Sequence, residues 1–325
     1  MKDIAKILKS SEKIAIFVHV SADGDALGSA FALKYCLEKQ GKIVDVYLNE
    51  PVSERLEFLP EKMSFKYKIG KIDGEYNVFV ALDCGDEFRL GAYKDSFLSH
   101  HLTVNIDHHF TNNGYAMYNY VDAKAAACGE IIALLAREME FELDENLAMF
   151  LYTAISSDTG CFAYSNVTEH THLLAAKLTK TGIDCAQINR NLFSTLTVSE
   201  IKLKAFVMQS LELYHGGNLA VAVVTEDKLK ECGASYEHTE GLVDILRSIK
   251  GVEIGCLIKE KDNQVKGSIR TNTFVDASEI SSELGGGGHK RAAGFSTSLS
   301  IEDTKKMIID ITKNFFRGSE LDRYC

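Results

Sequence analysis

At 325 residues the chain is long enough for two domains of ordinary size, and its composition is that of a globular protein. No apolar run approaches the roughly 20 residues of a membrane-spanning helix, and the charged N-terminus does not resemble a secretory signal, so we expect a cytoplasmic protein without a membrane partner. The net charge of −10 argues against a protein that holds long duplex nucleic acid, because such proteins usually carry a basic stripe.

The first half of the chain alternates β-rich apolar runs with helical patterns. Buried strands are expected at Ile14–Val20, Ile43–Leu48, Val78–Asp83 and Leu102–Ile106. Helices are expected at Asp25–Gln40, Ala125–Glu140, Glu145–Ser156 and Thr168–Thr181. Such alternation is typical of a parallel sheet with helices on both faces, so we expect an α/β domain over residues 1–185.

The pattern changes after a mostly helical linker, which is expected at residues 186–212. Strands are then expected at Leu219–Thr225, Val252–Lys259 and Val265–Arg270, and helices near Glu240–Ser248 and at Ile301–Phe316. A glycine run at 285–288 lies between two helical patterns. We therefore expect a smaller mixed α/β domain over residues 213–325.

The eight cysteines are scattered along the chain, and no two of them form a CxxC pair. Most lie among apolar residues, where a reduced cysteine behaves as a small hydrophobic side chain. This placement favours reduced structural thiols over disulfides or a zinc site.

Aspartate and histidine side chains follow several of the predicted strands. In an open α/β sheet, ligands bind outside the carboxyl ends of the strands. One carboxylate at such a place is usually a helix cap, and Asp25 alone could cap the helix that follows it. Four separate segments that bring Asp and His to the same edge of the sheet are harder to explain as caps. So many carboxylates would repel one another unless cations lay between them. The candidate metal ligands are His19, Asp23, Asp25, Asp83, His108 and Asp158.

The types of these ligands narrow the choice of metal. Four carboxylates and two imidazoles without a thiolate favour Mn²⁺ over zinc, with Mg²⁺ as the alternative. Two ions about 3.5–4 Å apart need one bridging carboxylate, and we expect Asp83 in that role because it ends a central strand. A site of this kind activates water and clamps the attacking and leaving oxygens, which predicts phosphoester hydrolysis.

Six motifs of the chain resemble those of one protein family. HVSADGDALGS, VALDCGD, NIDHH and SDTGCF are similar to the four motifs of the DHH phosphoesterases, and SIRTN with GGGGHKRAAGF resembles their DHHA1 substrate-binding module. The compact length is similar to that of the stand-alone members, which degrade short oligoribonucleotides (nanoRNA) to mononucleotides and remove the 3′-phosphate of pAp. Two alternatives stay open: an enzyme acting mainly on pApA or cyclic-di-AMP, and a non-catalytic nucleotide-binding regulator.

The resemblance also implies roles for individual residues. It implies that Asp83 is shared between one metal ion held with His19 and Asp23, and a second held with Asp25, His108 and Asp158. Asp107 would orient the neighbouring imidazole, and His109 would face the scissile phosphate.

Further residues are expected to bind short single-stranded RNA, dinucleotides or mononucleotides. Arg270 and His289 would hold a terminal phosphate or nucleotide, with Gly287 and Gly288 allowing close approach to the backbone. Arg89 contacts either a phosphate or Asp86, whereas Lys290 and Arg291 are expected to be ordinary surface charges. The oligomeric state stays open, and the resemblance is compatible with a homodimer.

Overall fold

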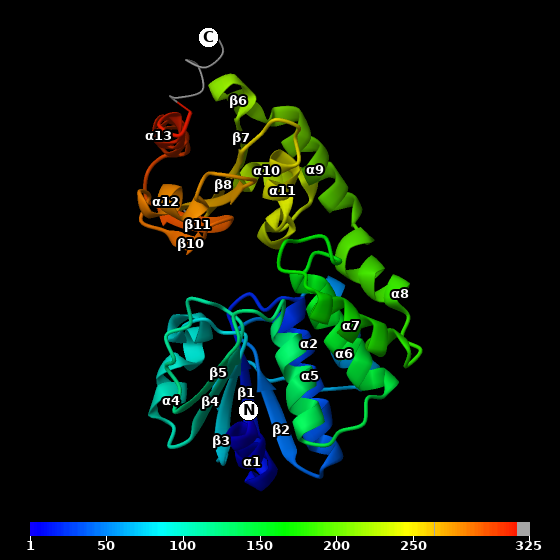
Figure 1. The fold of residues 1–325 in the computed structure, drawn as a ribbon. Helices are drawn as coiled ribbons and strands as arrows, with labels where there is room; N and C mark the ends of the chain where they lie inside the picture. The colour runs from blue at the N-terminus through cyan, green and yellow to red at the C-terminus, as the bar shows by residue number, and fades with distance from the viewer. Residues whose placement is uncertain (263, 317–325) are drawn as a thin grey trace. The chain divides into compact units, whose positions relative to one another are not determined.

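The computed structural model describes residues 1–262 and 264–316. The chain forms two compact units, Met1–Thr195 and Leu196–Cys325, and each is built on its own sheet (Figure 1). In the described part of the chain, no helix combines the length and the apolar character that crossing a membrane requires. The segment expected to be a linker falls across this division, because α8 (Cys185–Asn189) belongs to the first unit and α9 (Val198–Ser210) to the second.

The first unit contains a wholly parallel five-stranded sheet in the order β2-β1-β3-β4-β5. Its strands are β1 (Lys13–Val18), β2 (Ile43–Tyr47), β3 (Val78–Leu82), β4 (Thr103–Asp107) and β5 (Tyr118–Val121). The first four are the expected strands, each with bounds within two residues of those predicted. β5 was not expected, because its mostly exposed side chains give it no apolar run.

Helices cover both faces of this sheet, which confirms the predicted fold class. Successive strand residues point to opposite faces, so Ile16 packs into one core and Phe17 into the other. The larger core includes α1, α2, α5 and α6, and the smaller core, rich in aromatic rings, includes α4. The helices of this unit besides α8 are α1 (Lys2–Ser10), α2 (Gly24–Lys39), α3 (Phe58–Lys62), α4 (Lys94–Ser99), α5 (Cys128–Glu138), α6 (Glu145–Asp158) and α7 (Glu169–Thr179).

The second unit contains a mixed six-stranded sheet in the order β10-β11-β9-β8-β7-β6, in which only β7 and β8 run parallel. One face packs against α9, α10 and α11, and the other against α12 and α13. The strands are β6 (Glu212–Tyr214), β7 (Leu219–Val224), β8 (Ile254–Lys261), β9 (Gln264–Thr271), β10 (Gly287–His289) and β11 (Ala292–Thr297). The helices besides α9 are α10 (Glu226–Cys232), α11 (Leu242–Arg247), α12 (Ala277–Ser282) and α13 (Ile301–Lys313).

The glycine run differs from its prediction, because it does not simply connect two helices. Gly287 and Gly288 begin a β-hairpin, β10–β11, which pairs with β9. Gly288 has φ of 148°, and a Cβ there would lie 2.6 Å from Ala293 Cα. The glycine is therefore needed for the hairpin itself.

The cysteines of the described residues are free thiols, five of them buried: Cys36, Cys84, Cys128, Cys232 and Cys256. This agrees with the expectation of reduced structural thiols. Cys325 lies outside the described residues.

A buried carboxylate fastens the loop that follows β9. Glu253 is 5% exposed and accepts hydrogen bonds from the backbone N–H groups of residues 273–275 at 2.8–3.0 Å. Arg291 holds the same loop by its carbonyl groups, donating to Val275 O at 2.9 Å and to Thr273 O. The expectation that Arg291 is an ordinary surface charge was therefore wrong.

Replacing Glu253 by Gln should lower the free energy of unfolding by about 2 kcal/mol, because an amide N–H would then face backbone donors. Burial raises the pKa of Glu253, but hydrogen bonds from the loop hold it below its usual value. The carboxylate should therefore contribute fully to the free energy of unfolding at neutral pH. This contribution should be lost as the pH falls below the ordinary glutamate range. Urea denaturation at several pH values measures both effects.

The matched control is Glu279→Gln, at an exposed position of α12, which should change the stability by less than about 0.5 kcal/mol. Equal losses in the two variants would contradict the role assigned to Glu253.

Candidate metal centre

The carboxyl ends of three neighbouring strands meet the ends of two helices at one edge of the first sheet. The strand order reverses at β1, since β2 lies on one side of it and β3 and β4 on the other. Open α/β sheets bind ligands at such a point. The side chains gathered there are His19 after β1, Asp23 and Asp25 at the start of α2, Asp83 after β3, Asp107, His108 and His109 around the end of β4, and Asp158 at the end of α6.

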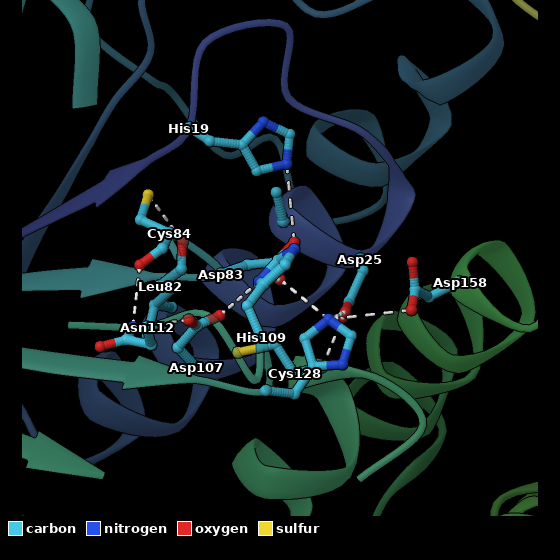
Figure 2. A network of polar contacts seen from close by, with 12 residues as sticks. His19, Asp25, Leu82, Asp83, Cys84, Asp107, His109, Asn112, Cys128 and Asp158 are labelled. Atoms are coloured by element: carbon cyan, nitrogen blue, oxygen red, sulfur yellow. Dashed lines mark hydrogen bonds and ion pairs between the residues drawn. The ribbon is translucent and has the colours of Figure 1, made fainter. Parts of the chain in front are cut away.

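Asp83 lies between two groups of these side chains, as Figure 2 shows. Its Oδ2 is 3.6 Å from His19 Nε2, and that nitrogen is 3.7 Å from Asp23 Oδ1. Its Oδ1 is 3.3 Å from His108 Nε2. Each oxygen of Asp83 thus faces a different group, which is the geometry that a bridging carboxylate needs.

The second group consists of Asp83, His108, Asp25 and Asp158. His108 Nε2 is 3.7 Å from Asp25 Oδ2 and 3.7 Å from Asp158 Oδ2. The possible ligand atoms of Asp25, His108 and Asp158 all lie within 4.8 Å of one another, as do those of the first group. All six predicted ligands therefore converge, in two groups that share one carboxylate.

The conformation of Asp83 is itself unusual. Its φ is 57°, a left-handed value that costs a non-glycine residue roughly 1–3 kcal/mol. The side chain is 3% exposed, and within the described residues its Oδ1 accepts no hydrogen bond. A buried carboxylate oxygen without a donor is costly unless a cation lies beside it. This observation fits a pair of divalent cations at the two groups.

Both histidines are oriented by a backbone carbonyl. His19 Nδ1 is 2.8 Å from Val20 O, and His108 Nδ1 is 3.3 Å from Ala125 O. When Nδ1 donates its proton to a carbonyl, the lone pair of Nε2 faces the carboxylates, as a metal ligand requires.

Arg89 lies beside this centre, on the 3₁₀ segment Glu87–Tyr93. Its Nη2 is 2.9 Å from His19 Nδ1, but that nitrogen cannot accept from Arg89 while it donates to Val20 O. When His19 is a metal ligand, the guanidinium of Arg89 can therefore donate to another acceptor. Asp86, the alternative partner predicted for Arg89, accepts instead from its backbone N–H at 3.0 Å.

The two aspartates that follow β1 have different tasks. Asp23 caps α2, accepting from the N–H groups of Asp25 and Ala26 at 3.0 and 3.1 Å. Asp25 accepts instead from the N–H groups of Cys128 and Gly129, at 2.7 and 2.9 Å, where α5 begins. The cap that sequence patterns allowed for Asp25 alone is thus supplied by Asp23, and Asp25 is held against another helix N-terminus.

The electrostatics of the centre reflect this crowding. Burial and the neighbouring Asp83 raise the pKa of Asp25 well above its usual value. Burial also raises the pKa of Asp158 to about 7, although His108 opposes it. Burial alone would lower the pKa of His19, but Asp23 and Asp83 raise it to about 10. Without metal ions, protons therefore do part of the neutralisation that divalent cations would do.

Asp107 orients an imidazole, but that of His109 and not that of His108. Its Oδ1 is 2.7 Å from His109 Nδ1, and its Oδ2 accepts from Asn112 Nδ2 at 2.6 Å. Asn112 also lies 2.8 Å from Asn105 Oδ1. Sequence reasoning missed Asn112; its position in the loop directly after the DHH triplet was the available signal.

Three of the predicted substrate-binding residues of the second unit, Arg270, Gly287 and His289, lie on one face of its sheet, whereas Gly288 between the last two belongs to the other face. In the strand register Ala292 pairs with Arg270 on one side and with His289 on the other. Directly paired residues of antiparallel strands point to the same face, so Arg270 and His289 share it. Gly287 and His289 are exposed, and a Cβ at Gly287 would meet nothing within 4 Å, which leaves space for a ligand.

Comparisons with known proteins agree with these motifs. The model for the DHH family, N-terminal domain, matches residues 13–155, and that for the DHHA1 domain matches residues 216–317. The bifunctional oligoribonuclease and PAP phosphatase NrnA of Thermus thermophilus is 31% identical over 316 residues, covering 96% of this chain and 93% of that protein.

Solved structures show the same architecture. An exopolyphosphatase-related protein from Bacteroides fragilis superposes with a TM-score of 0.89 at 25% identity, over 97% of this chain and 96% of that one. The exonuclease RecJ bound to manganese superposes with a TM-score of 0.55 at 13% identity, over 96% of this chain and 94% of that one. The second similarity concerns the fold alone.

Adding Mn²⁺ to the metal-free protein should raise its melting temperature, and Asp83→Ala should abolish this rise because Asp83 serves both groups. One ion at a hundredfold excess over its dissociation constant adds about 2.7 kcal/mol. His19→Ala should keep part of the rise, since the second group is intact. Differential scanning fluorimetry with and without Mn²⁺ measures these shifts.

Asp86→Asn is the matched control, because Asp86 follows the same strand but lies outside both groups. It should retain the full response to Mn²⁺. A normal response in Asp83→Ala would contradict the shared role of Asp83.

Proposed function

The chain belongs to the DHH family of phosphoesterases and carries a DHHA1 domain, and on that premise we propose that it hydrolyses short oligoribonucleotides to mononucleotides and removes the 3′-phosphate of pAp. The observation that carries this proposal is the complete set of six candidate ligand side chains, in which five surround Asp83. A regulator that had lost turnover would be expected to lack part of that set. The similarity to an oligoribonuclease and PAP phosphatase over nearly the whole chain supports the substrate class.

We propose Mn²⁺ as the metal, with Mg²⁺ as the alternative. The donor atoms are carboxylate oxygens and imidazole nitrogens, which suit these ions. Two cysteines lie near the centre, but burial raises the pKa of the Cys84 and Cys128 thiols well above the usual value, with Asp83 adding to the effect. Among the described residues, neither cysteine belongs to a group of side chains that could hold an ion, so no thiolate that would favour zinc is among the candidate ligands.

When bound, the ions supply Lewis acidity to the phosphoryl oxygens and activate water for attack. Asp83 keeps the two ligand groups together, and Asp25 and Asp158 contribute the remaining negative charge of the second group. His109 lies beside them, with its Nδ1 3.7 Å from Asp83 Oδ1. Burial alone would lower the pKa of His109, but Asp107 and Asp83 raise it, which favours a protonated ring that would stabilise negative charge on the phosphate.

In this proposal the second unit binds the substrate and takes no part in bond cleavage. Arg270 presents a planar guanidinium that suits a phosphate, and His289 lies on the same face of the sheet. Together they would hold the nucleotide while the first unit acts on its phosphate.

Purified protein with Mn²⁺ should release mononucleotides from a 5′-phosphorylated dinucleotide and phosphate from pAp. Release of neither product would refute the proposed function. Comparing kcat/KM for these substrates with the values for pApA and cyclic-di-AMP decides whether one of the latter is preferred. Tight binding of pAp without hydrolysis would support a regulator instead.

His289→Ala should raise KM by about tenfold and leave kcat nearly unchanged, because His289 contributes to binding and not to cleavage. Steady-state kinetics on the dinucleotide measures both constants. Lys290→Ala removes the neighbouring exposed side chain and should leave both constants unchanged. A loss confined to kcat in His289→Ala would contradict this assignment.

A further inference from the structure

The face of the second sheet that carries Arg270 and His289 continues beyond them. The register pairs Lys266 of β9 with Lys259 of β8, and Arg270, Ser268 and Lys266 alternate along β9. All four side chains therefore lie on the same face. On this face, helices α9–α11 cover β7 and β8. At the opposite edge of the sheet, residues of β10 and β11 are exposed, so this part of the face is accessible to a ligand.

Between the two ends of β9, the part of this face formed by β9, β11 and β10 carries small side chains, while Leu257 of β8 is covered by the helices. Ser268 pairs with Gly294 of β11, and Gly294 pairs with Gly287 of β10. Both glycines are exposed, and so is Ser296, which pairs with Lys266. A ligand could thus lie close to the strand backbone, between Arg270 at one end and the lysines at the other.

Lys259 and Lys266 are an unusual pair, because like charges directly opposite each other destabilise a sheet. Within the described residues neither lysine forms an ion pair with a carboxylate, and the same holds for Arg270. Lys259 Nζ lies over the Tyr236 ring, 5.2 Å from its centroid. An anion between the lysines would relieve their repulsion.

The electrostatics agree with this geometry. Burial lowers the pKa of Lys259; Glu240 raises it, and Arg270 and Lys266 lower it further. Arg270 and Lys266 are thus close enough for their charges to act on Lys259, and an anionic ligand on this face would be attracted by all three.

The spacing limits the size of that ligand. Arg270 and Lys266 are four residues apart in one strand, which is about 13 Å. The two phosphates of a single nucleotide such as pAp are closer together than this. A ligand with a further phosphodiester group is long enough to contact both ends of the row.

We propose that Lys259 and Lys266 bind a phosphodiester group of an oligonucleotide whose terminal phosphate lies at Arg270 and His289, and that this contact favours oligonucleotides over pAp. This inference rests on the proposed function. It assigns a second phosphate subsite to the DHHA1 sheet and predicts that the two substrates respond differently to the same substitution.

The test compares kinetics on a 5′-phosphorylated tetranucleotide and on pAp for the double variant Lys259→Gln/Lys266→Gln. KM for the tetranucleotide should rise by about tenfold or more, with kcat within about twofold of the wild type. Both constants for pAp should be unchanged. The salt dependence of tetranucleotide binding should also weaken, its slope falling by about 0.7 for each phosphate group that the variant no longer neutralises.

Two controls separate the subsite from general effects. The double Arg variant, Lys259→Arg/Lys266→Arg, keeps both charges and should restore tetranucleotide binding. Lys306→Gln removes an exposed charge from α13, which packs on the opposite face of the sheet. This variant should leave the kinetic constants for both substrates unchanged. Equal effects of the double Gln variant on both substrates, or no effect on the tetranucleotide, would overturn the proposal.

A binding measurement keeps this result separate from the fate of the proposed function. Fluorescence anisotropy of a labelled 5′-phosphorylated tetranucleotide, without added metal, needs no turnover. If the wild type hydrolyses neither substrate, the proposed function fails, but weaker binding by the double Gln variant still supports the subsite. Equal binding by the two proteins, or no binding by the wild type, would refute the subsite.

Discussion

The candidate metal centre of the first unit depends on holding three carboxylates close together: Asp25 and Asp83, which are buried, and Asp158, which is partly exposed. Carboxylates so placed repel one another, and burial increases the cost. The fold offsets part of it with donors fixed in the backbone, since the N-terminus of α5 donates two N–H groups to Asp25. Without metal ions, a protonated His108 provides positive charge to all three carboxylates. Because negative charge remains, cation binding should stabilise the folded protein.

The parallel sheet explains why these groups meet with the required precision. Each strand end is fixed by its neighbours, so a side chain one or two residues beyond it has little freedom. Asp83 adds a left-handed backbone that directs its two oxygens to different groups. Around this centre, Asp107 and Asn112 hold His109 through short hydrogen bonds. In our proposal the first unit supplies the chemistry, whereas the basic face of the second sheet selects the substrate.

Much of this arrangement follows from local sequence rules, because a buried parallel strand is a continuous apolar run whose end locates the site. What the rules missed depends on tertiary contacts. The N–H donors of Asp25 lie 103 and 104 residues further along the chain, so its role could not be read from its own helix. The carbonyl partners of Arg291 exist only once the loop at 271–275 has formed. The β10–β11 hairpin was missed because its glycines and alanines show no alternation of apolar and polar residues.

The most direct test of the central claim is an anomalous-scattering measurement on crystals grown with Mn²⁺. Two manganese peaks about 3.5–4 Å apart are expected. Asp83 should contact both, with His19 and Asp23 at one peak and His108 with its two carboxylates at the other. A single peak, or two peaks of which Asp83 touches only one, would contradict the claim that this carboxylate joins the two groups.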